Sequence, residues 1–257
     1  MAIPALKRKL ADLELALGSW ITLAHPAIAE IMARAGFDFL VVDLEHSVIT
    51  IREAEELIRV IGLCGAAPLV RLTSNDANLI KRVMDAGAHG VIVPMVNSRA
   101  DAERAVAAVQ YPPRGSRGVG LARAQGYGTS FEDYRRWLAE ETVVIVQIEH
   151  IDAVRDLEAI LATPGVDGFI IGPYDLSASM GIPGQFDHPD VVAAIARIRS
   201  VSAAMGKSGG MHVVEPTPEK VAAFVADGFR FLAYSLDTRM LDVACRSGLA
   251  ECRRALP

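Results

Sequence analysis

The sequence predicts a single (β/α)8 barrel, in which eight parallel strands close into a cylinder surrounded by helices. The chain has 257 residues, a typical length for one such barrel. Eight short apolar runs alternate with helical patterns along the chain, and this alternation favours one closed barrel over separate domains. Gly36, Gly87, Gly165 and Gly228 each stand between a helical pattern and the next apolar run, where a left-handed residue closes a helix.

The elements follow from these patterns. Apolar runs predict strands at 18–24, 38–43, 67–71, 90–94, 143–148, 168–172, 208–213 and 230–234. Helical patterns occupy 26–35, 51–63, 76–86, 99–109, 151–162, 189–205, 217–227 and 238–255. We expect an extra N-terminal helix before the first strand. A doubly wound open sheet is the alternative. Since no linker or low-complexity tract interrupts the chain, residues 1–257 are assigned to one domain.

Composition excludes several classes of protein. Hydrophobic residues make up 51% of the chain and charged residues 22%, which suits a large core and not a disordered chain. A net charge of −5 gives no basic footprint for nucleic acid or an anionic membrane. The three cysteines lack metal-ligand spacing, and no run reaches the roughly 18 apolar residues of a membrane helix. The N-terminus lacks the apolar centre of a signal peptide. We expect a soluble, cytoplasmic protein.

The segment 111–141 breaks the alternation because it is long and rich in glycine. It does not follow a strand and open a helix with the glycine spacing of a phosphate-binding loop, so a nucleotide site is not favoured. Two interpretations stay open. The segment either acts at the active site as a functional or mobile loop, or is an ordered loop packed against another subunit.

Two carboxylates follow neighbouring strands. Glu149 comes after the fifth apolar run and Asp175 after the sixth. Parallel strand ends share one rim in a barrel, so the two could hold one hard divalent cation and leave positions for water and substrate. Alternatively, Glu149 pairs with Arg71 or Arg123, and Asp175 caps a short helix. Because Gln147 points the same way as Glu149, the metal site is the preferred interpretation.

A second polar group follows the strand at 38–43. Asp43 ends that strand and His46 follows it, so the histidine could transfer protons while the aspartate orients its ring. The alternative is a solvated loop histidine. Glu45, between them, is assigned no role. Arg71 ends the next strand and needs an anionic partner, either Glu149 or a substrate carboxylate or enolate.

Other residue types narrow the chemistry. None of the five lysines lies at the expected carboxyl end of a strand, which argues against a Schiff base. There is no G-x-S-x-G motif, and Ser235 has no evident histidine partner. His212 either lines the pocket or is a hydrogen-bonded wall residue. Trp20 either lines the pocket together with residues 117–128, or packs in the core.

At these residues the chain resembles the HpcH/HpaI family of class II, metal-dependent pyruvate aldolases. The similar stretches are AGFDFLVVDLEHS, PLVRLTSNDANLIKRVMDAGAHGVIVPMV, YPPRGSRGVG, VQIE and GVDGFIIGPYDLSASMG. They run in the family's order from about residue 18 to 185. The resemblance implies reversible aldol cleavage of a 4-hydroxy-2-oxo acid to pyruvate, or a close 2-oxoacid, and an aldehyde. Another metal-enolate C–C lyase or decarboxylase, or a non-catalytic barrel that binds a carboxylate metabolite, are the alternatives.

The resemblance also implies roles for residues. Glu149 and Asp175 would ligate Mg²⁺, Mn²⁺ or Co²⁺, with His46 as the general base and Arg71 stabilising the enolate. Gln147 would contact the oxoacid.

Three further implications concern the carboxylate end of the substrate, the base and the assembly. Backbone amides around Tyr174 and Asp175 would hold the pyruvate carboxylate. Asp85 would raise the basicity of His46, although it lies at a helix end towards the other rim, so it would have to act across a subunit interface. The resemblance implies a homohexamer, a trimer of dimers, whose subunits often exchange the last helix.

The chain departs from the family in two places near the expected aldehyde site. Tyr174 stands where the family often has a small residue. The strand at 208–213 belongs to a stretch that reads GGMHVVEP, where some members are apolar. The identity of the aldehyde is therefore left open.

Overall fold

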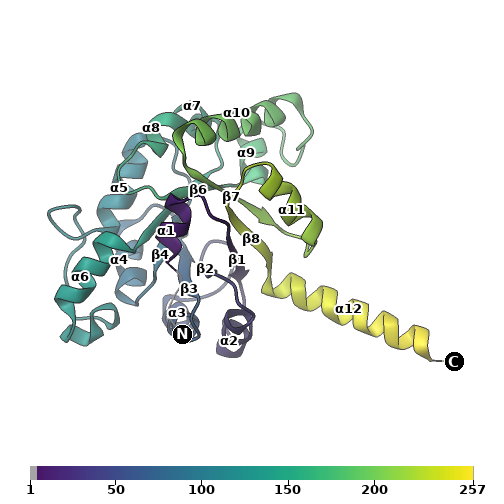
Figure 1. Cartoon of the computed structure of the whole chain (residues 1–257), viewed down its shortest axis with the longest axis horizontal. Coiled ribbons are helices and arrows are strands. Elements are labelled where there is room, and N and C mark those ends of the chain that lie inside the picture. Colours follow the sequence, from purple (N-terminus) through teal and green to yellow (C-terminus); the bar gives the residue numbers. More distant parts are fainter. Residues whose placement is uncertain (1–4, 257) are drawn as a thin grey trace.

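The computed structural model describes residues 5–256 and contains the expected closed barrel. All eight strands are parallel, each pairs with the next, and the first pairs with the last, so the open-sheet alternative is wrong (Figure 1). The strands are β1 (Ala16–Ile21), β2 (Phe39–Asp43), β3 (Ala67–Arg71), β4 (Gly90–Val93), β5 (Val143–Ile148), β6 (Gly168–Ile171), β7 (Ser208–Val213) and β8 (Phe231–Leu236).

Helices surround this barrel, and the last one projects away from it (Figure 1). They are α1 (Leu6–Ala11), α2 (Pro26–Arg34), α3 (Ile51–Leu63), α4 (Ala77–Asp85), α5 (Arg99–Val109), α6 (Phe131–Glu140), α7 (Ile151–Arg155), α8 (Leu157–Leu161), α9 (Pro173–Ser179), α10 (Pro189–Met205), α11 (Pro218–Ala226) and α12 (Asp237–Ala255), with the 3-10 helix η1 (Arg123–Gly128). Within residues 5–256, no helix is both long and apolar enough to cross a membrane.

The expected extra N-terminal helix is α1, and it belongs to the core inside the barrel. Leu6 and Leu10 are buried with Ala16, Phe39 and Phe231, which lie at the starts of their strands. Because these residues mark the amino-terminal end of the barrel, α1 closes that end. The opposite end, where the strands stop, is left for the polar side chains.

Close packing inside the barrel depends on one small residue. The Phe39 and Phe231 rings stack with centroids 4.3 Å apart. A Cβ at Gly18 would lie 2.3 Å from the Phe39 ring, so no larger residue fits there without moving the ring. A second and larger core lies between the strands and the helices that cover them.

The turns from helix to strand follow the expected glycine pattern. Gly36, Gly87, Gly165 and Gly228 all have positive φ angles, between 93° and 99°. Residues with a side chain rarely adopt this conformation, so glycine ends each helix and redirects the chain into β2, β4, β6 and β8.

The larger differences from the expectations concern α6, the helix expected at 151–162 and the first strand, while several other boundaries differ by one or two residues. The glycine-rich segment contains α6, whose buried Tyr134 and Leu138 are four residues apart on one helix face, a spacing that the glycines before it obscured. The helix expected at 151–162 is split into α7 and α8 at Asp156, which accepts a hydrogen bond from the Arg99 backbone. The first strand starts at Ala16 and ends at Ile21, earlier than expected.

Candidate active site

A cavity of about 520 Å³ opens at the carboxyl end of the barrel strands. Side chains from β1, β2, β3, β5, β6, β7 and β8, or from the loops that follow them, line it. Eight of the ten residues that the sequence nominated for the site are among them: Trp20, Asp43, His46, Arg71, Gln147, Tyr174, Asp175 and His212. No lysine lines this cavity, as the argument against a Schiff base requires. The ninth nominated residue, Glu149, accepts a hydrogen bond from Gln147 of the cavity wall. The tenth, Asp85, does not line the cavity and lies beside Arg117.

Arg71 is held rigidly by Asp43. Its Nε and Nη2 atoms donate to the two carboxylate oxygens at 2.9 and 2.6 Å, and its guanidinium carbon lies 4.3 Å from the centre of the Trp20 ring. The two residues are register partners at the ends of β2 and β3. Arg71 therefore has the anionic partner that its burial requires, but that partner is Asp43 and not Glu149.

Asp43 also organises the loop after β2. Its Oδ1 atom accepts the backbone N–H groups of Glu45 and His46 at 3.0 and 3.2 Å. The carboxylate thus holds the main chain of His46 and not its ring. The His46 side chain is 66% exposed at the mouth of the cavity, and its Nε2 atom is 3.9 Å from Glu45 Oε2.

Glu149 is almost completely buried, with 3% of its surface exposed. Its Oε1 atom accepts the backbone N–H of Met95 at 2.7 Å, and Gln147 Nε2 donates to Oε2. Met95 has a φ of 51°, a strained conformation for a residue with a side chain, and such strain is found preferentially at functional sites. Burial raises the pKa of Glu149, the two hydrogen bonds oppose this, and the charge of Asp175 adds to it.

The structure does not support either of the simpler explanations for the two carboxylates. Within residues 5–256, Glu149 forms no ion pair with Arg71 or Arg123, and Arg123 donates to the Ala86 carbonyl. Helix α9 begins at Pro173, after Gly172, so Asp175 lies in its first turn and does not cap it.

Gly172 makes room for Glu149. A Cβ atom at this position would lie 2.9 Å from both the Cβ and Oε2 atoms of Glu149. Any side chain here would displace the carboxylate. No sequence pattern singles out Gly172, because its contact with Glu149 joins the end of β6 to the end of β5.

Glu45, to which the sequence analysis assigned no role, is a fourth acidic group at the site. Its side chain is 17% exposed, Arg71 Nη1 is 3.4 Å from Oε2, and Oε2 is buried without a hydrogen-bond partner among the described residues. Burial raises its pKa to about 7, Arg71 opposes the shift, and the charges of Glu149, Asp43 and Asp175 increase it. The only sequence signal was its position between Asp43 and His46.

The charges around the cavity suit a hard cation. Four carboxylates, those of Asp43, Glu45, Glu149 and Asp175, surround the single guanidinium of Arg71. Residues 5–256 contain no cluster of three or more histidine, cysteine or acidic side chains arranged as metal ligands. Two protein carboxylates with the remaining positions open to water and substrate are, however, a common way to bind Mg²⁺. The residues present therefore fit a divalent cation at Glu149 and Asp175.

Asp85 lies away from this cavity within one chain. It ends α4, and one of its oxygens is 3.5 Å from Nη1 of the buried Arg117. Arg117 in turn packs over the Tyr111 ring and donates to the Tyr134 hydroxyl. Burial raises the pKa of Asp85. A contribution to His46 from a neighbouring subunit stays a prediction.

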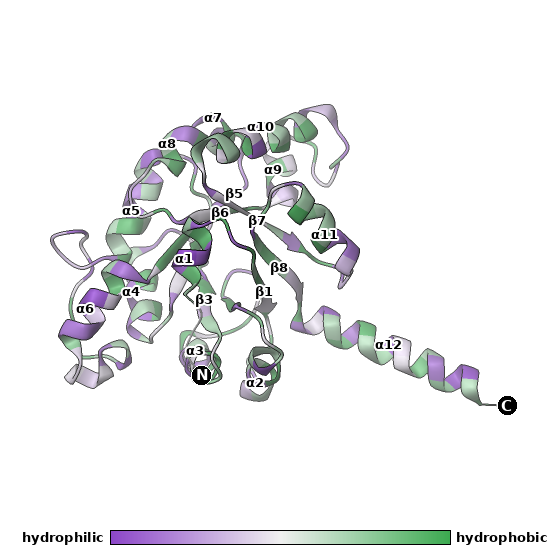
Figure 2. Cartoon of the chain, in the orientation of Figure 1, coloured by the Kyte–Doolittle hydropathy of each residue, from purple (hydrophilic) through white to green (hydrophobic). Residues whose placement is uncertain are grey.

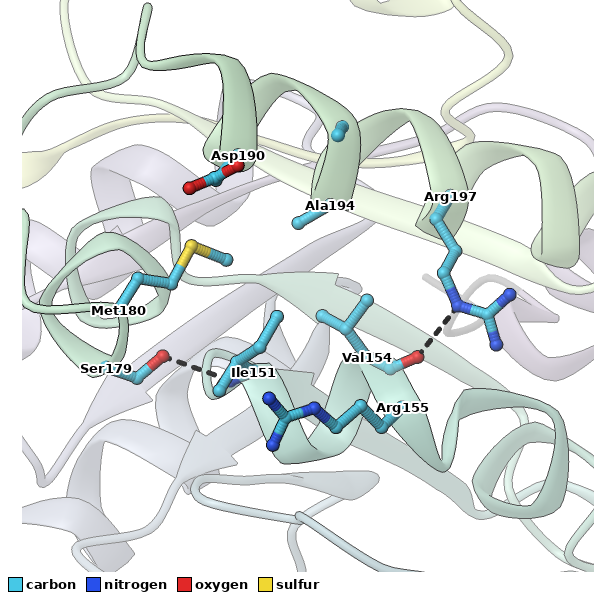
Figure 3. Close-up of a pocket in the computed structure, with 9 residues that line it drawn as sticks. Ile151, Val154, Arg155, Ser179, Met180, Asp190, Ala194 and Arg197 are labelled. Carbon is cyan, nitrogen blue, oxygen red and sulfur yellow. Dashed lines mark hydrogen bonds between the residues drawn. The ribbon is translucent and has the colours of Figure 1, made fainter.

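Hydrogen bonds join α7 to the two helices α9 and α10. A second cavity of about 530 Å³ lies outside the barrel between α7, α9 and α10 (Figure 3). At its edge the Ile151 N–H donates to Ser179 Oγ at 3.0 Å, and Arg197 donates to the Val154 carbonyl at 3.1 Å. The first bond joins α7, the helix after Glu149, to α9, the helix that carries Asp175, and the second joins α7 to α10.

Comparison with known protein families assigns most of the chain to one family. The model of the family described as HpcH/HpaI aldolase/citrate lyase matches residues 16–243. The chain belongs to this family. It is therefore an aldolase, an enzyme that acts on carbon–carbon bonds, as the sequence predicted, and not a non-catalytic binding barrel.

Relatives of this aldolase carry several different substrate names. It is 39% identical to 2-dehydro-3,6-dideoxy-6-sulfogluconate aldolase of Pseudomonas putida, over 88% of each chain. It is 38% identical to hydroxypyruvate/pyruvate aldolase of Paraburkholderia phytofirmans, over 96% of this chain and 97% of the relative. It is 39% identical to 2-keto-3-deoxy-L-rhamnonate aldolase of Klebsiella pneumoniae, over 95% and 91%.

Solved structures show the same fold. The crystal structure of a family member from Burkholderia cenocepacia matches with a TM-score of 0.91 and 34% identity, over 97% of this chain and 99% of that one. The citrate lyase β subunit of M. tuberculosis, complexed with oxaloacetate and magnesium, matches with a TM-score of 0.60 and 17% identity, over 90% and 95%. At that identity the second likeness concerns the fold alone.

Proposed function

We propose that this aldolase is a class II enzyme that reversibly cleaves 4-hydroxy-2-oxo acids to pyruvate, or a close 2-oxoacid, and an aldehyde. The observation that carries the proposal is the convergence of Arg71 with the Glu149–Asp175 pair at one cavity. Relatives named hydroxypyruvate/pyruvate aldolase support the oxoacid class. Small-molecule oxoacids and aldehydes are thus the proposed partners.

Glu149 and Asp175 would hold the divalent cation, Mg²⁺, Mn²⁺ or Co²⁺. When bound, such a cation acts as a Lewis acid that draws electron density from the 2-oxo group. Gln147 supports this site because its amide nitrogen donates to Glu149. Its amide oxygen is buried and has no partner within residues 5–256, which leaves it for the proposed contact with the oxoacid. The backbone N–H groups around Tyr174 and Asp175, in the first turn of α9, would hold the substrate carboxylate.

Arg71 stabilises the charge that develops in the reaction. Asp43 fixes its Nε and Nη2 atoms, and the guanidinium lies against the face of Trp20, so the remaining N–H groups have a defined direction. A donor that is already oriented stabilises an enolate oxygen without reorganisation during the reaction. Arg71 is therefore assigned to the enolate.

His46 is assigned as the general base, the group that accepts the substrate proton. In cleavage, directly or through a water, it removes the proton of the C4 hydroxyl, the C3–C4 bond breaks, and its electron pair forms the enolate while C4 leaves as the aldehyde. Protonation of the enolate at C3 then gives pyruvate. The exposed position of His46 lets it exchange that proton with solvent. Asp85 of a neighbouring subunit is proposed to increase its basicity.

The test is metal dependence. A chelator is expected to abolish pyruvate release from 4-hydroxy-2-oxo acids, and Mg²⁺, Mn²⁺ or Co²⁺ is expected to restore it; both would be followed by a coupled pyruvate assay. Activity that resists the chelator and is trapped by borohydride would contradict the proposal. Release of CO2 without any aldehyde would favour the alternative, a decarboxylase that uses the same groups.

A further inference from the structure

One wall of the cavity carries no carboxylate. It is formed by Trp20 on β1, His212 and Val214 at β7, and Leu236 on β8. The proposed cation and oxoacid sites lie on β5 and β6, with Arg71 on β3. The wall from β7 to β1 therefore faces the remaining part of the substrate, which is the aldehyde.

His212 has a defined orientation in this wall. Its Nε2 atom lies 3.1 Å from the Ser235 carbonyl oxygen. A carbonyl only accepts hydrogen bonds, so Nε2 carries the hydrogen. Burial lowers the pKa of His212 to about 4, which keeps the ring neutral near pH 7. Its Nδ1 atom is then an unprotonated acceptor, and no residue among 5–256 donates to it.

Ser235 is itself held in an unusual conformation that fixes this contact. It is fully buried and has a φ of 53°, which is uncommon for a residue with a side chain. Its hydroxyl donates to the Val214 carbonyl at 2.9 Å, and its carbonyl also accepts the Ser19 hydroxyl at 3.2 Å. The backbone is thus held with the carbonyl towards β7, where it sets the tautomer of His212. The sequence showed no histidine partner for the Ser235 hydroxyl. The structure shows that a histidine, His212, instead contacts the Ser235 carbonyl.

Trp20, whose ring neighbours that of His212, adds a hydrogen-bond donor to the same wall. The centres of the Trp20 and His212 rings are 5.5 Å apart. The Trp20 Nε1 atom is buried and has no hydrogen-bond partner within residues 5–256. A buried donor without a partner is costly, whereas a hydroxyl group can accept one hydrogen bond and donate another. The two side chains together suit a hydroxyl more than an aliphatic carbon.

We propose that His212 determines specificity by accepting a hydrogen bond at Nδ1 from a hydroxyl of the aldehyde. This inference rests on the proposed aldol reaction. It assigns the enzyme to hydroxyaldehydes, and in the cleavage direction to 2-oxo acids with hydroxyls at both C4 and C5. Some family members are apolar at this strand end. The proposed hydrogen bond explains why a polar residue, His212, stands there in this chain.

The test compares matched pairs of aldehydes that differ by one hydroxyl. Condensation of pyruvate with glycolaldehyde and acetaldehyde, and with lactaldehyde and propanal, would be measured for the wild type, His212→Leu and His212→Asn. The ratio of kcat/KM values for hydroxylated and deoxy aldehydes is expected to fall about five- to tenfold in His212→Leu. His212→Asn, which keeps an acceptor near Nδ1, is expected to restore part of it. Comparing ratios between variants cancels the intrinsic reactivity of each aldehyde.

Two controls separate this inference from the proposed function. Exchange of the pyruvate methyl protons with D2O, in the presence of Mg²⁺, reports on the oxoacid half alone. If the wild type exchanges protons and condenses both aldehydes, an unchanged ratio in His212→Leu overturns the role of His212 and leaves the aldolase intact. If the wild type shows neither proton exchange nor condensation, both the proposed aldolase reaction and the role of His212 are overturned.

A spectroscopic measurement covers the case in which the variants do not fold. The ¹⁵N NMR spectrum of histidine-labelled wild-type protein at pH 7 is expected to show His212 protonated at Nε2 and unprotonated at Nδ1. A ring protonated at Nδ1 would have no acceptor to offer and would contradict the inference.

Discussion

Single residues carry the chemistry of this aldolase through contacts between different strands. Asp43 and Arg71 illustrate this, because the two bonds between them orient the guanidinium and leave Glu149 free of an ion pair. Both residues were nominated from their positions at strand ends. Their pairing depends on the register between β2 and β3, which a single sequence does not state.

Glu149 and His46 are expected to fail in different ways when replaced. Glu149→Gln keeps the shape of the side chain but removes a charged ligand, so cation affinity is expected to fall about tenfold or more. His46→Ala is expected to keep cation affinity and to lose about a hundredfold or more in kcat, because only the proton acceptor is removed. Calorimetric titration with Mn²⁺ measures the cation affinity of both variants, and steady-state kinetics measure their kcat. Full activity of His46→Ala would remove it as the base.

Gly172→Ala tests the space around Glu149. The added methyl would lie 2.9 Å from the Glu149 carboxylate oxygen, so the carboxylate must move and cation affinity is expected to fall severalfold or more. Gly62→Ala in α3 is the matched control, because a Cβ there meets only Pro68 at 3.9 Å. The control is expected to keep full cation affinity and gain up to about 1 kcal/mol of stability. Equal affinity in both variants would contradict the packing argument.

At the scale of helices and strands, sequence patterns predicted the strands well but missed one helix. The strands could be predicted closely because a strand buried on both faces reads as a continuous apolar run, and β3, β5 and β7 begin and end at the expected residues. Helix α6 was missed although Tyr134 and Leu138 have helical spacing, because the glycines before it favour an irregular chain. Its position depends on tertiary contacts, among them the packing of Trp137 against His89.

His89 at the start of β4 makes the contact with α6 sensitive to acid. It is 4% exposed, and burial lowers its pKa to about 4 against a smaller opposing effect of the Glu141 backbone. Below pH 6.5 the unfolded chain binds a proton that the folded chain does not, so stability falls as the pH falls from 6.5 towards 4.

His89→Phe is expected to remove this loss. Relative to the wild type, the variant should gain about 2 kcal/mol more at pH 5 than at pH 8. Thermal or urea unfolding at both pH values measures the difference. The effect of replacing the ring itself is common to both pH values and cancels. An equal difference at pH 5 and pH 8 would show that His89 is protonated at pH 5 in the folded protein as it is in the unfolded chain, and would contradict the prediction.

At the scale of the whole molecule, most of the last helix is left uncovered by the rest of the described chain. Helix α12 projects from the barrel and carries hydrophobic and hydrophilic residues along its length (Figures 1 and 2). Only its first residue, Asp237, is buried, where it accepts hydrogen bonds from Thr22 and the Leu23 backbone. Leu241 and Leu249 are 53% and 52% exposed. The exchange of the last helix in a hexamer, which the family resemblance implies, stays a prediction, and this exposed helix is the segment that it concerns.

Association through α12 is expected to depend on its leucines. Sedimentation velocity should show a hexamer for the wild type and smaller species for the double variant Leu241→Glu/Leu249→Glu, since buried charges oppose an apolar contact. Circular dichroism should show a folded barrel in both, because neither leucine is buried in the single chain. A monomeric wild type would contradict the hexamer and the proposed contribution of Asp85 across the interface.

The sequence by itself determined the barrel, the rim and most of the residues around the cavity, because apolar runs of strand length and glycines after helices are local signals. It also determined the reaction class through motifs that keep their order along the chain. Only the tertiary structure decided that Asp43 pairs with Arg71, that Gly172 makes room for Glu149, that Glu45 is buried among like charges, and that the Ser235 carbonyl orients His212. These contacts join residues brought together by strand register and barrel closure, and no local pattern of residues encodes such distances.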